Sequence, residues 1–382
     1  MYYNDFINKI KEKMPSRIYS HEADLDGFVS GNILYHISKY LFDKSPKIKY
    51  INYDRLNNIS ADENEIIWVS DLNYNKSMDD KINGLMFIID HHKWEPDPID
   101  CTPDHPFCDK IYYIHDTTKS ASLLCFELLK EIVNNSDNNP NKEYYQKYIE
   151  DIKDLVIQTN IGDIFKYNST DELIEARSYA RYFNDVIKPY LYCAETILNC
   201  KKEDLLSSFY KSYKESKYYN KYKAELNQLL LLYEDELNKK QNEIHPGIYN
   251  IQYIKGDYSM IFNILLEKYK NIKAIITEIK NPNTYKWSLS VRSKDNKTAY
   301  HIASKYFNGG GHPNASGAVL EYYFDYHKYL SEHNEILFTL PDEDNGIYPQ
   351  MIPSDKQKMY ETENKEVWEF VNNKLKDYKD ME

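Results

Sequence analysis

Strand-like apolar runs in the first third of the chain lead repeatedly into an Asp or a His. Apolar residues from Gly27 to Leu41 recur at helical spacing between the first two runs, and another helical pattern follows the fifth. Continuous apolar strands that alternate with helices are typical of a mostly parallel sheet with both faces covered. The runs are Arg17–Ser20, Lys47–Tyr53, Glu65–Ser70, Leu85–Ile89 and Ile111–Ile114.

The polar residues beside these runs are hard carboxylates and imidazoles, which bind divalent metals through oxygen and nitrogen. In parallel sheets the carboxyl ends of the strands meet at one edge, and ligands bind there. Burying so many ionisable groups without a metal is costly. We therefore expect a cage for two divalent metals at this edge. The residues that follow these runs are His21, Asp71, Asp90, His91 and His92.

The rest of the chain predicts three further parts. Residues 171–245 have a strongly charged helical pattern and predict a helical connector. After the break at His245-Pro-Gly247, strands and helices alternate again and predict a smaller α/β domain. We expect an α/β protein with an N-terminal domain (1–170) built on a mostly parallel five-stranded sheet flanked by helices. The connector (171–245), the second domain (246–325) and a C-terminal extension (326–382) follow.

Composition excludes several classes of protein. The formal net charge is −12 without a basic block, which weighs against a long duplex lying across the molecule. A small anionic substrate held by metals needs no basic exterior. The five Cys contain no CxxC pair, so we expect reduced thiols. No apolar run has the length of a membrane span, and the N-terminus has no apolar signal core, so we expect no membrane and a cytoplasmic protein.

The order of these motifs resembles the DHH phosphoesterase superfamily. The likeness is carried by His21, Asp24, Asp26-Gly27, Asp71, Asp90-His91-His92 and Asp163 over residues 17–165. Val291-Arg292-Ser293 followed by Gly309-Gly-Gly-His312 looks like the signature of its companion DHHA1 domain, over residues 248–322. The combination is similar to nano-RNases, cyclic-dinucleotide phosphodiesterases, 3′-phosphoadenosine phosphatases and RecJ-type exonucleases.

The resemblance implies a dinuclear metal site, with Mn²⁺ expected and Mg²⁺ or Co²⁺ as alternatives. It implies that His21 and Asp24 hold one metal, that Asp26, His91 and Asp163 hold the other, and that Asp71 bridges them. His92 is expected to face the scissile phosphate as an orienter or proton donor. Asp90 is expected to brace the histidines, as carboxylates commonly do beside metal-bound imidazoles. Glu22 is a further candidate for the first metal site.

The second domain is expected to bind the substrate. Consecutive glycines can bring backbone N–H groups close to a phosphate, and an Arg can contact it with two hydrogen bonds. The resemblance carries this role to Arg292, Gly310, Gly311 and His312. A helix C-cap with a tight turn at Gly309–Gly311 is the structural alternative, and both can hold together.

These features predict a phosphodiesterase that hydrolyses short oligonucleotides, cyclic dinucleotides or phosphonucleotides by two-metal activation of water, in a cleft between the domains. His92 and Asp90 are the expected catalytic pair. One alternative is a RecJ-like exonuclease on longer single strands, and another is a catalytically silent scaffold subunit. Inorganic pyrophosphatase chemistry is a third. The expected partner is the short oligonucleotide or small phosphonucleotide substrate. Whether the chain forms a homodimer is left open.

Overall fold

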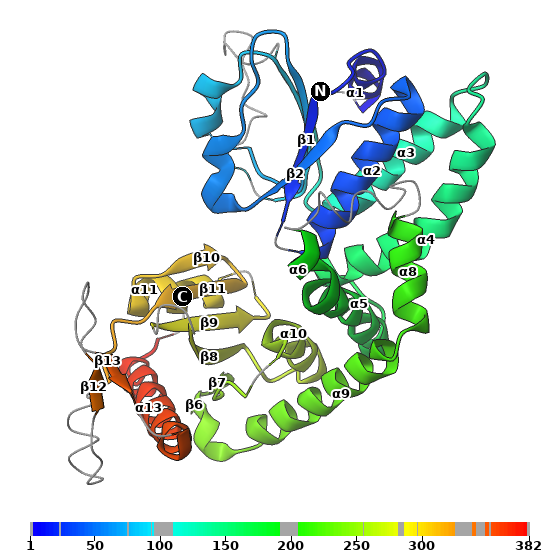
Figure 1. Cartoon of the computed structure of the whole chain (residues 1–382). Coiled ribbons are helices and arrows are strands. Elements are labelled where there is room, and N and C mark those ends of the chain that lie inside the picture. The colour runs from blue at the N-terminus through cyan, green and yellow to red at the C-terminus, as the bar shows by residue number, and fades with distance from the viewer. Residues whose placement is uncertain are drawn as a thin grey trace. The chain divides into compact units, whose positions relative to one another are not determined.

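The computed structural model describes residues 3–22, 24–74, 76–92, 94, 110–191, 205–254, 256–281, 286–295, 297–324, 338–340, 348–350 and 353–379. The chain divides into two compact units, Met1–Glu225 and Leu226–Glu382 (Figure 1). The boundary between them falls within helix α9 (Tyr218–Leu237). The four-part division expected from the sequence stays a prediction.

A five-stranded parallel sheet forms the centre of the first unit. Its strand order is β2-β1-β3-β4-β5, and every neighbouring pair is parallel. This confirms the sheet predicted from the apolar runs, and each strand begins within one residue of its predicted start. The strands are β1 (Arg17–His21), β2 (Lys47–Ile51), β3 (Ile66–Ser70), β4 (Leu85–Asp90) and β5 (Ile111–His115).

Both faces of this sheet are buried, because the apolar residues run continuously along its central strands. Trp68 and Phe87 belong to the larger core, to which several helices of the first unit also contribute. Val69 and Ile88, one position further along each strand, belong to a second core beneath the loops and short helices of the other face. Side chains alternate between faces along a strand, so a strand buried on both faces must be apolar throughout.

Helices α2, α3 and α4 cover one face of the first sheet and pack against one another (Figure 1). Residues of α5 and α8 also belong to the larger core, for example Tyr179 and Phe209. The helices are α1 (Tyr3–Ile10), α2 (Leu25–Phe42), α3 (Ala121–Asn134), α4 (Lys142–Ile164), α5 (Thr170–Tyr182), α6 (Lys188–Leu191) and α8 (Leu205–Glu215), with 3-10 helices η1 (Tyr53–Asn58) and η2 (Lys76–Lys81) and the π turn η4 (Phe183–Ile187).

The second unit contains a six-stranded mixed sheet of order β10-β11-β9-β8-β7-β6, in which only β7 and β8 are parallel neighbours. Helices α11 and α13 supply residues to the core on one face, and α10 lies against β8 and β9. The elements are η6 (Lys240–Asn242), β6 (Glu243–His245), β7 (Ile248–Asn250), α10 (Tyr258–Lys268), β8 (Ala274–Lys280), β9 (Trp287–Ser293), α11 (Thr298–Phe307), β10 (Gly310–His312), β11 (Ala315–Val319) and α13 (Pro353–Lys374), with a separate pair, β12 (Phe338–Leu340) and β13 (Tyr348–Gln350).

Gly310 and Gly311 of the glycine run lie in a strand, β10, and not in the tight turn that is the structural alternative. Helix α11 ends at Phe307, and its C-cap Asn308 adopts the left-handed conformation, so the cap residue is not a glycine. Gly310–His312 then pairs with β11 as an antiparallel hairpin. A Cβ on Gly309 would lie 2.1 Å from the carbonyl oxygen of Gly317, and Gly311 has a φ of 133°. The glycines therefore allow this close strand approach.

The described part of the chain contains no helix that combines the length and the apolar character of a membrane span. Cys125 is a buried free thiol on α3. The other four cysteines (Cys101, Cys108, Cys193 and Cys200) lie outside the described residues.

Candidate metal centre

Acidic and imidazole side chains gather at the carboxyl edge of the three central strands of the first sheet. His21 ends β1, Asp71 directly follows β3, and His91 follows β4. Two helices add carboxylates: Asp26 lies in the first turn of α2, and Asp163 lies at the end of α4. The parallel topology brings residues that are up to 142 positions apart in the sequence to this one edge.

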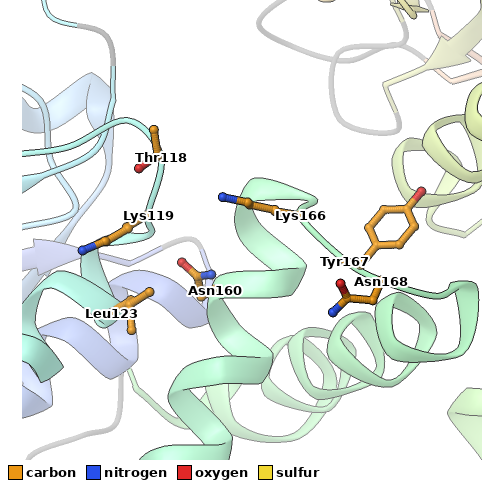
Figure 2. Close-up of a pocket in the computed structure, with 7 residues that line it drawn as sticks. All are labelled: Thr118, Lys119, Leu123, Asn160, Lys166, Tyr167 and Asn168. Carbon is orange, nitrogen blue, oxygen red and sulfur yellow. The ribbon is translucent and has the colours of Figure 1, made fainter.

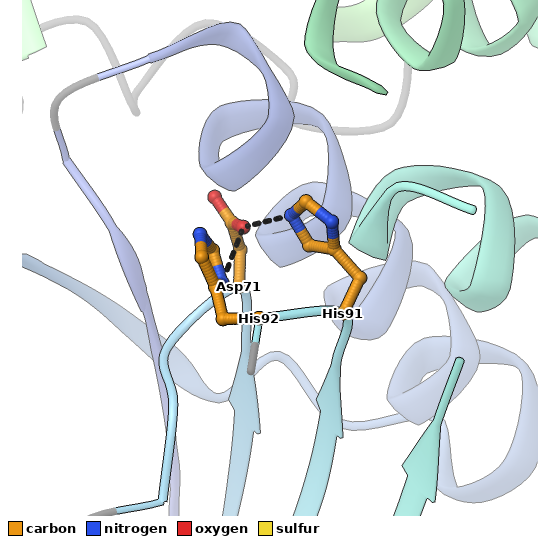
Figure 3. Close-up of side chains that lie close together, drawn as sticks. All are labelled: Asp71, His91 and His92. Carbon is orange, nitrogen blue, oxygen red and sulfur yellow. Dashed lines mark ion pairs between the residues drawn. The ribbon is translucent and has the colours of Figure 1, made fainter. Parts of the chain in front are cut away.

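Asp71 lies at the middle of the cluster, with a histidine on either side (Figure 3). Its Oδ1 is 3.3 Å from Nε2 of His91 and 3.9 Å from Nδ1 of His92. Asp71 is only 1% exposed and has a φ of 55°, which is left-handed backbone that Asp tolerates better than most residues. This turn directs the carboxylate between the two imidazoles.

His21 lies near the second carboxylate oxygen of Asp71, Oδ2. Its Nδ1 lies 2.9 Å from Oδ2 of Asp24 and 3.4 Å from Oδ2 of Asp71. Asp24 is the N-cap of α2 and accepts a hydrogen bond from the Gly27 amide at 3.0 Å. A Cβ at Gly27 would lie 2.2 Å from the carbonyl oxygen of His21, so only glycine lets the helix start this close to the strand end.

A third group forms around His91. Its Nε2 is 3.3 Å from Oδ2 of Asp163 and 3.7 Å from Oδ2 of Asp26. Asp26 is fixed by the start of α3, where the backbone amides of Ala121 and Ser122 donate to its two oxygens at 2.8 and 2.9 Å. Free amides at a helix N-terminus favour a carboxylate. Asp26 is thereby held in place while its Oδ2 still faces His91.

Three groups in the described residues have the composition and spacing of metal ligands, and Asp71 and His91 link them. In each, the candidate atoms lie within 4.8 Å of one another. Four of the buried atoms that face into the cluster make no hydrogen bond there, a state that native proteins seldom tolerate. Carboxylate oxygens suit Mg²⁺ and Mn²⁺, and imidazole nitrogens suit transition-metal ions. The residues therefore fit divalent cations. The four atoms are Nδ1 of His21, Oδ2 of Asp71, Nε2 of His91 and Oδ2 of Asp163.

The electrostatics point in the same direction. Burial raises the pKa of Asp71 well above its usual range, and the charges of Asp24 and Asp26 raise it further. Burial, followed by the charge of Asp26, raises the pKa of Asp163 to about 7. Burial opposes the charged form of His21, but the adjacent carboxylates of Asp24 and Asp71 outweigh it and raise the pKa of His21 to about 10. The cluster carries excess negative charge that a bound cation would offset.

Residues 16–157 match the model of the DHH family, N-terminal domain. The chain contains a DHH domain. The match includes every cluster residue named above except Asp163, which lies six residues beyond its end. The DHH resemblance predicted from the motif order is thus confirmed, whereas the DHHA1 resemblance of residues 248–322 and the role of each residue stay predictions.

Three solved structures illustrate what this chain is similar to. An exopolyphosphatase-related protein from Bacteroides fragilis is 19% identical, with a TM-score of 0.44 and 96% of this chain and 98% of that chain covered. A pGpG-specific phosphodiesterase from Vibrio cholerae is 13% identical (TM-score 0.46, 83% and 97% covered). RecJ from Thermus thermophilus, in complex with Mg²⁺, is also 13% identical, with a TM-score of 0.38 and with 83% of this chain and 49% of that chain covered. Comparison with curated proteins gives no significant match.

Asp90 of the DHH domain supports the histidines from behind. Its Oδ1 lies 2.8 Å from Nδ1 of His92, and its Oδ2 accepts hydrogen bonds from the His92 amide and from Nε1 of Trp94. Burial disfavours the charged carboxylate, but His92 and Trp94 outweigh it and lower the pKa of Asp90. His115 donates to the His92 carbonyl at 2.6 Å and stacks on Trp94. Asp90 therefore stays ionised and fixes the ring of His92.

Tyr53 is a residue of the DHH site that the sequence analysis missed. It begins η1, shortly after β2, and its hydroxyl lies 2.8 Å from Nε2 of His92. Its ring lies 4.6 Å from that of His21 between centroids. Glu22, the further candidate for the first metal site, instead accepts a hydrogen bond from Nδ2 of Asn52 and is in none of the three groups.

The residues predicted to bind substrate all lie in the second unit. Arg292 is half-buried on β9, where it donates to Ser259, Ser290 and the Val291 carbonyl at 3.1 to 3.2 Å. In the sheet register, Arg292 and His312 are both paired with Ala315 of β11, so Arg292 lies two strands from β10. Gly310 and Gly311 form β10, and the side chain of His312 is outside the described part.

Proposed function

We propose that the chain is a metal-dependent phosphoesterase that hydrolyses short oligonucleotides, cyclic dinucleotides or phosphonucleotides. One observation carries the proposal: Asp71 and His91 link three groups of carboxylates and imidazoles, and four of their buried atoms make no hydrogen bond in the described part of the chain. They lie in and beside a DHH family N-terminal domain, a family of phosphoesterases. A packing role alone would leave those polar atoms uncompensated.

The residues suggest a division of roles. His21 and Asp24 would hold one cation, and Asp26, His91 and Asp163 the other, with Asp71 between them. When bound, two divalent cations lower the pKa of a water and stabilise negative charge on the phosphate oxygens. We propose Mn²⁺ as the working metal, because the ligand set mixes imidazole with carboxylate.

His92 is the proposed proton donor. Its Nδ1 is bound to Asp90, so Nε2 is the nitrogen left to serve the substrate, and the side chain is 31% exposed. A proton on Nε2 can go to the leaving oxygen or stay hydrogen-bonded to a phosphate oxygen. Asp90 would stabilise the imidazolium, as a carboxylate behind a catalytic histidine does.

The substrate class is argued from charge. A net charge of −12 without a basic block gives no surface for a long polyanion, whereas a small phosphoester needs only the metals and a few donors. Arg292 and the β10 strand of the second unit are proposed as further substrate contacts, since a guanidinium and glycine amides both donate to phosphate.

The decisive test is hydrolysis of bis-p-nitrophenyl phosphate with Mn²⁺ or Mg²⁺, compared between the wild type and Asp71→Asn. Asparagine tolerates the left-handed backbone of position 71, so the substitution removes charge without forcing the turn to change. We expect Mn²⁺-dependent turnover in the wild type and a loss of at least 100-fold in the variant. Removing a group that only supports a metal ligand already lowers activity by about 10- to 100-fold, and Asp71 is a proposed ligand itself. Asp151→Asn, an exposed position on α4, is the matched control.

A panel of substrates then defines the class. RNA and DNA of two to twenty nucleotides, cyclic dinucleotides and 3′,5′-phosphoadenosine are compared by rate under Mn²⁺. Rates that fall with length support the short-substrate proposal, and rates that rise steadily with length favour the RecJ-like alternative. A protein without turnover on any of these substrates, with or without Mn²⁺, would instead match the scaffold alternative.

A further inference from the structure

A pocket of about 340 Å³ opens in the first unit beside the end of α4 (Figure 2). Thr118 and Lys119 line it from the turn before α3, Asn160 lines it from α4, and Lys166 and Tyr167 line it from the segment after α4. Pockets for small molecules span roughly 300 to 1,000 Å³, so this one suits a single nucleotide-sized group.

The pocket adjoins the candidate metal centre through two elements. Asn160 lies three residues before Asp163 on α4, which is about 4.5 Å along the helix axis and on the same face. The Ser120 amide donates to Oδ1 of Asn160 at 2.8 Å, and the next two amides of the chain donate to Asp26. The start of α3 therefore supports a wall of the pocket and a candidate metal ligand at once.

The lining chemistry favours an anion. Lys119 and Lys166 both line the pocket, and none of the described lining residues is acidic, although the neighbouring metal centre is rich in carboxylates. Nζ of Lys119 is ion-paired with Glu127 at 2.8 and 3.0 Å, so its charge is partly offset. Lys166 makes no ion pair with a described residue, and Figure 2 shows its side chain directed toward the α3 side of the pocket.

Neutral donors complete the lining. Oδ1 of Asn160 already accepts the Ser120 amide, which leaves its Nδ2 as the group that can face a ligand. Thr118 and Asn168 add a hydroxyl and a second amide side chain. Ammonium, amide and hydroxyl donors around an acid-free space match the acceptor oxygens of a phosphate.

We propose that this pocket is a substrate subsite that binds a phosphate lying outside the bond that is cleaved, with Lys166 as its main charge. The inference rests on the proposed phosphoesterase function and refines it, because it selects substrates that carry a second phosphate near the scissile one. The metal centre then handles the reacting phosphate, and the pocket orients the rest of the substrate.

The test uses diadenylate without a terminal phosphate, with a 5′-phosphate and with a 3′-phosphate, which share one scissile phosphodiester. We expect the wild type to prefer one of the two phosphorylated forms in kcat/KM. In Lys166→Ala this preference should fall about 10-fold, the size of one charge-assisted hydrogen bond. Lys166→Arg should retain most of it. Lys147→Ala, an exposed lysine earlier on α4, should leave it unchanged.

A binding measurement keeps this inference separate from the proposed function. Calorimetric titration of chelator-treated protein with the same three compounds reports the subsite without turnover. A phosphorylated form should bind about 10-fold more weakly to Lys166→Ala than to the wild type. If the wild type hydrolyses none of the compounds but shows this binding difference, the proposed function fails and the subsite stands. If Lys166→Ala changes neither the preference nor the affinity, the subsite is wrong.

Discussion

The hydroxyl of Tyr53 lies 2.8 Å from Nε2 of His92, the nitrogen that Asp90 leaves open. The ring of Tyr53 also packs against His21. One side chain from η1 thus contacts an imidazole of the metal cluster and the proposed proton donor. A hydroxyl at this distance can fix the orientation of the imidazole until a substrate oxygen replaces it.

Tyr53→Phe should lower kcat for bis-p-nitrophenyl phosphate about 10-fold and change KM little. The variant keeps the ring against His21 and removes the hydroxyl's contacts with His92 and with the Asp71 carbonyl, the latter at 3.5 Å. Because the His92 contact is the shorter one, the effect should fall mainly on proton transfer. Steady-state kinetics at a saturating Mn²⁺ concentration measures it. Tyr144→Phe, at an exposed position on α4, is the control. A Tyr53→Phe enzyme with wild-type kcat would show that the contact has no part in turnover.

Divalent cations should stabilise the first unit. A ligand that binds only the folded state at a hundred times its Kd adds about 2.7 kcal/mol, which corresponds to about 5 to 10 °C in Tm for a unit of this size. Asp163→Asn should lose most of this increase. In the presence of chelator it should be as stable as the wild type or more stable, because burial and the charge of Asp26 disfavour the Asp163 carboxylate.

Thermal unfolding with EDTA, Mg²⁺ and Mn²⁺ checks this expectation. The exposed Asp151→Asn variant, on the same helix, should respond to metal as the wild type does. Equal metal-induced shifts in the wild type and in Asp163→Asn would remove Asp163 from the ligand set.

The strand ends of the site could be predicted from the sequence for a simple physical reason. A parallel strand buried on both faces must be apolar throughout, so Asp71 and Asp90 stand out as the points where a run stops. The parallel topology then forces these ends together. Asp71 and His91, which follow the neighbouring strands β3 and β4, approach to 3.3 Å in the structure.

Other contacts left no signal in the sequence. Tyr53 is one of 38 tyrosines, and only its tertiary position directs its hydroxyl to His92. The amides that hold Asp26 belong to the backbone and carry no residue preference of their own. The hairpin of β10 and β11 is different, because the Pro313-Asn314 turn signal and the later Gly317 do indicate it in the sequence.

Glu278 should make the second unit less stable as the pH rises. It lies fully buried on β8, and burial raises its pKa to about 7, with a hydrogen bond from Nδ2 of Asn250 opposing the shift. Because the folded pKa exceeds the usual value of 4.5, the folded state retains a proton that the unfolded chain releases. The contribution of Glu278 to the free energy of unfolding is therefore fully present below about pH 4.5. It falls by about 3 kcal/mol between about pH 4.5 and about pH 7 and is constant at higher pH.

Glu278→Gln should remove this dependence, since glutamine resembles the neutral acid. Urea unfolding at several pH values measures the free energy of unfolding of the variant and of the wild type. The variant should gain stability relative to the wild type as the pH rises from about 4.5 to about 7. The exposed Glu267→Gln should give a difference that does not vary with pH. A pH-independent difference for Glu278→Gln as well would show that this carboxyl is ionised in the folded protein.

Gly27→Ala should damage both stability and activity. An alanine Cβ would lie 2.2 Å from the His21 carbonyl oxygen and 2.7 Å from its carbonyl carbon, so helix α2 and the end of β1 must separate. Helix propensity favours alanine by about 1 kcal/mol, which the overpacking outweighs, and we expect a net loss of about 2 kcal/mol. Because His21 lies at the point of collision, turnover should fall further than the small loss of folded protein explains.

Gly310→Ala is the matched comparison, since a Cβ there meets nothing within 4 Å and stability should change by less than about 1 kcal/mol. Denaturation and bis-p-nitrophenyl phosphate kinetics on both variants decide the matter: a Gly27→Ala protein with unchanged stability and turnover would mean that the helix does not need this approach to present His21.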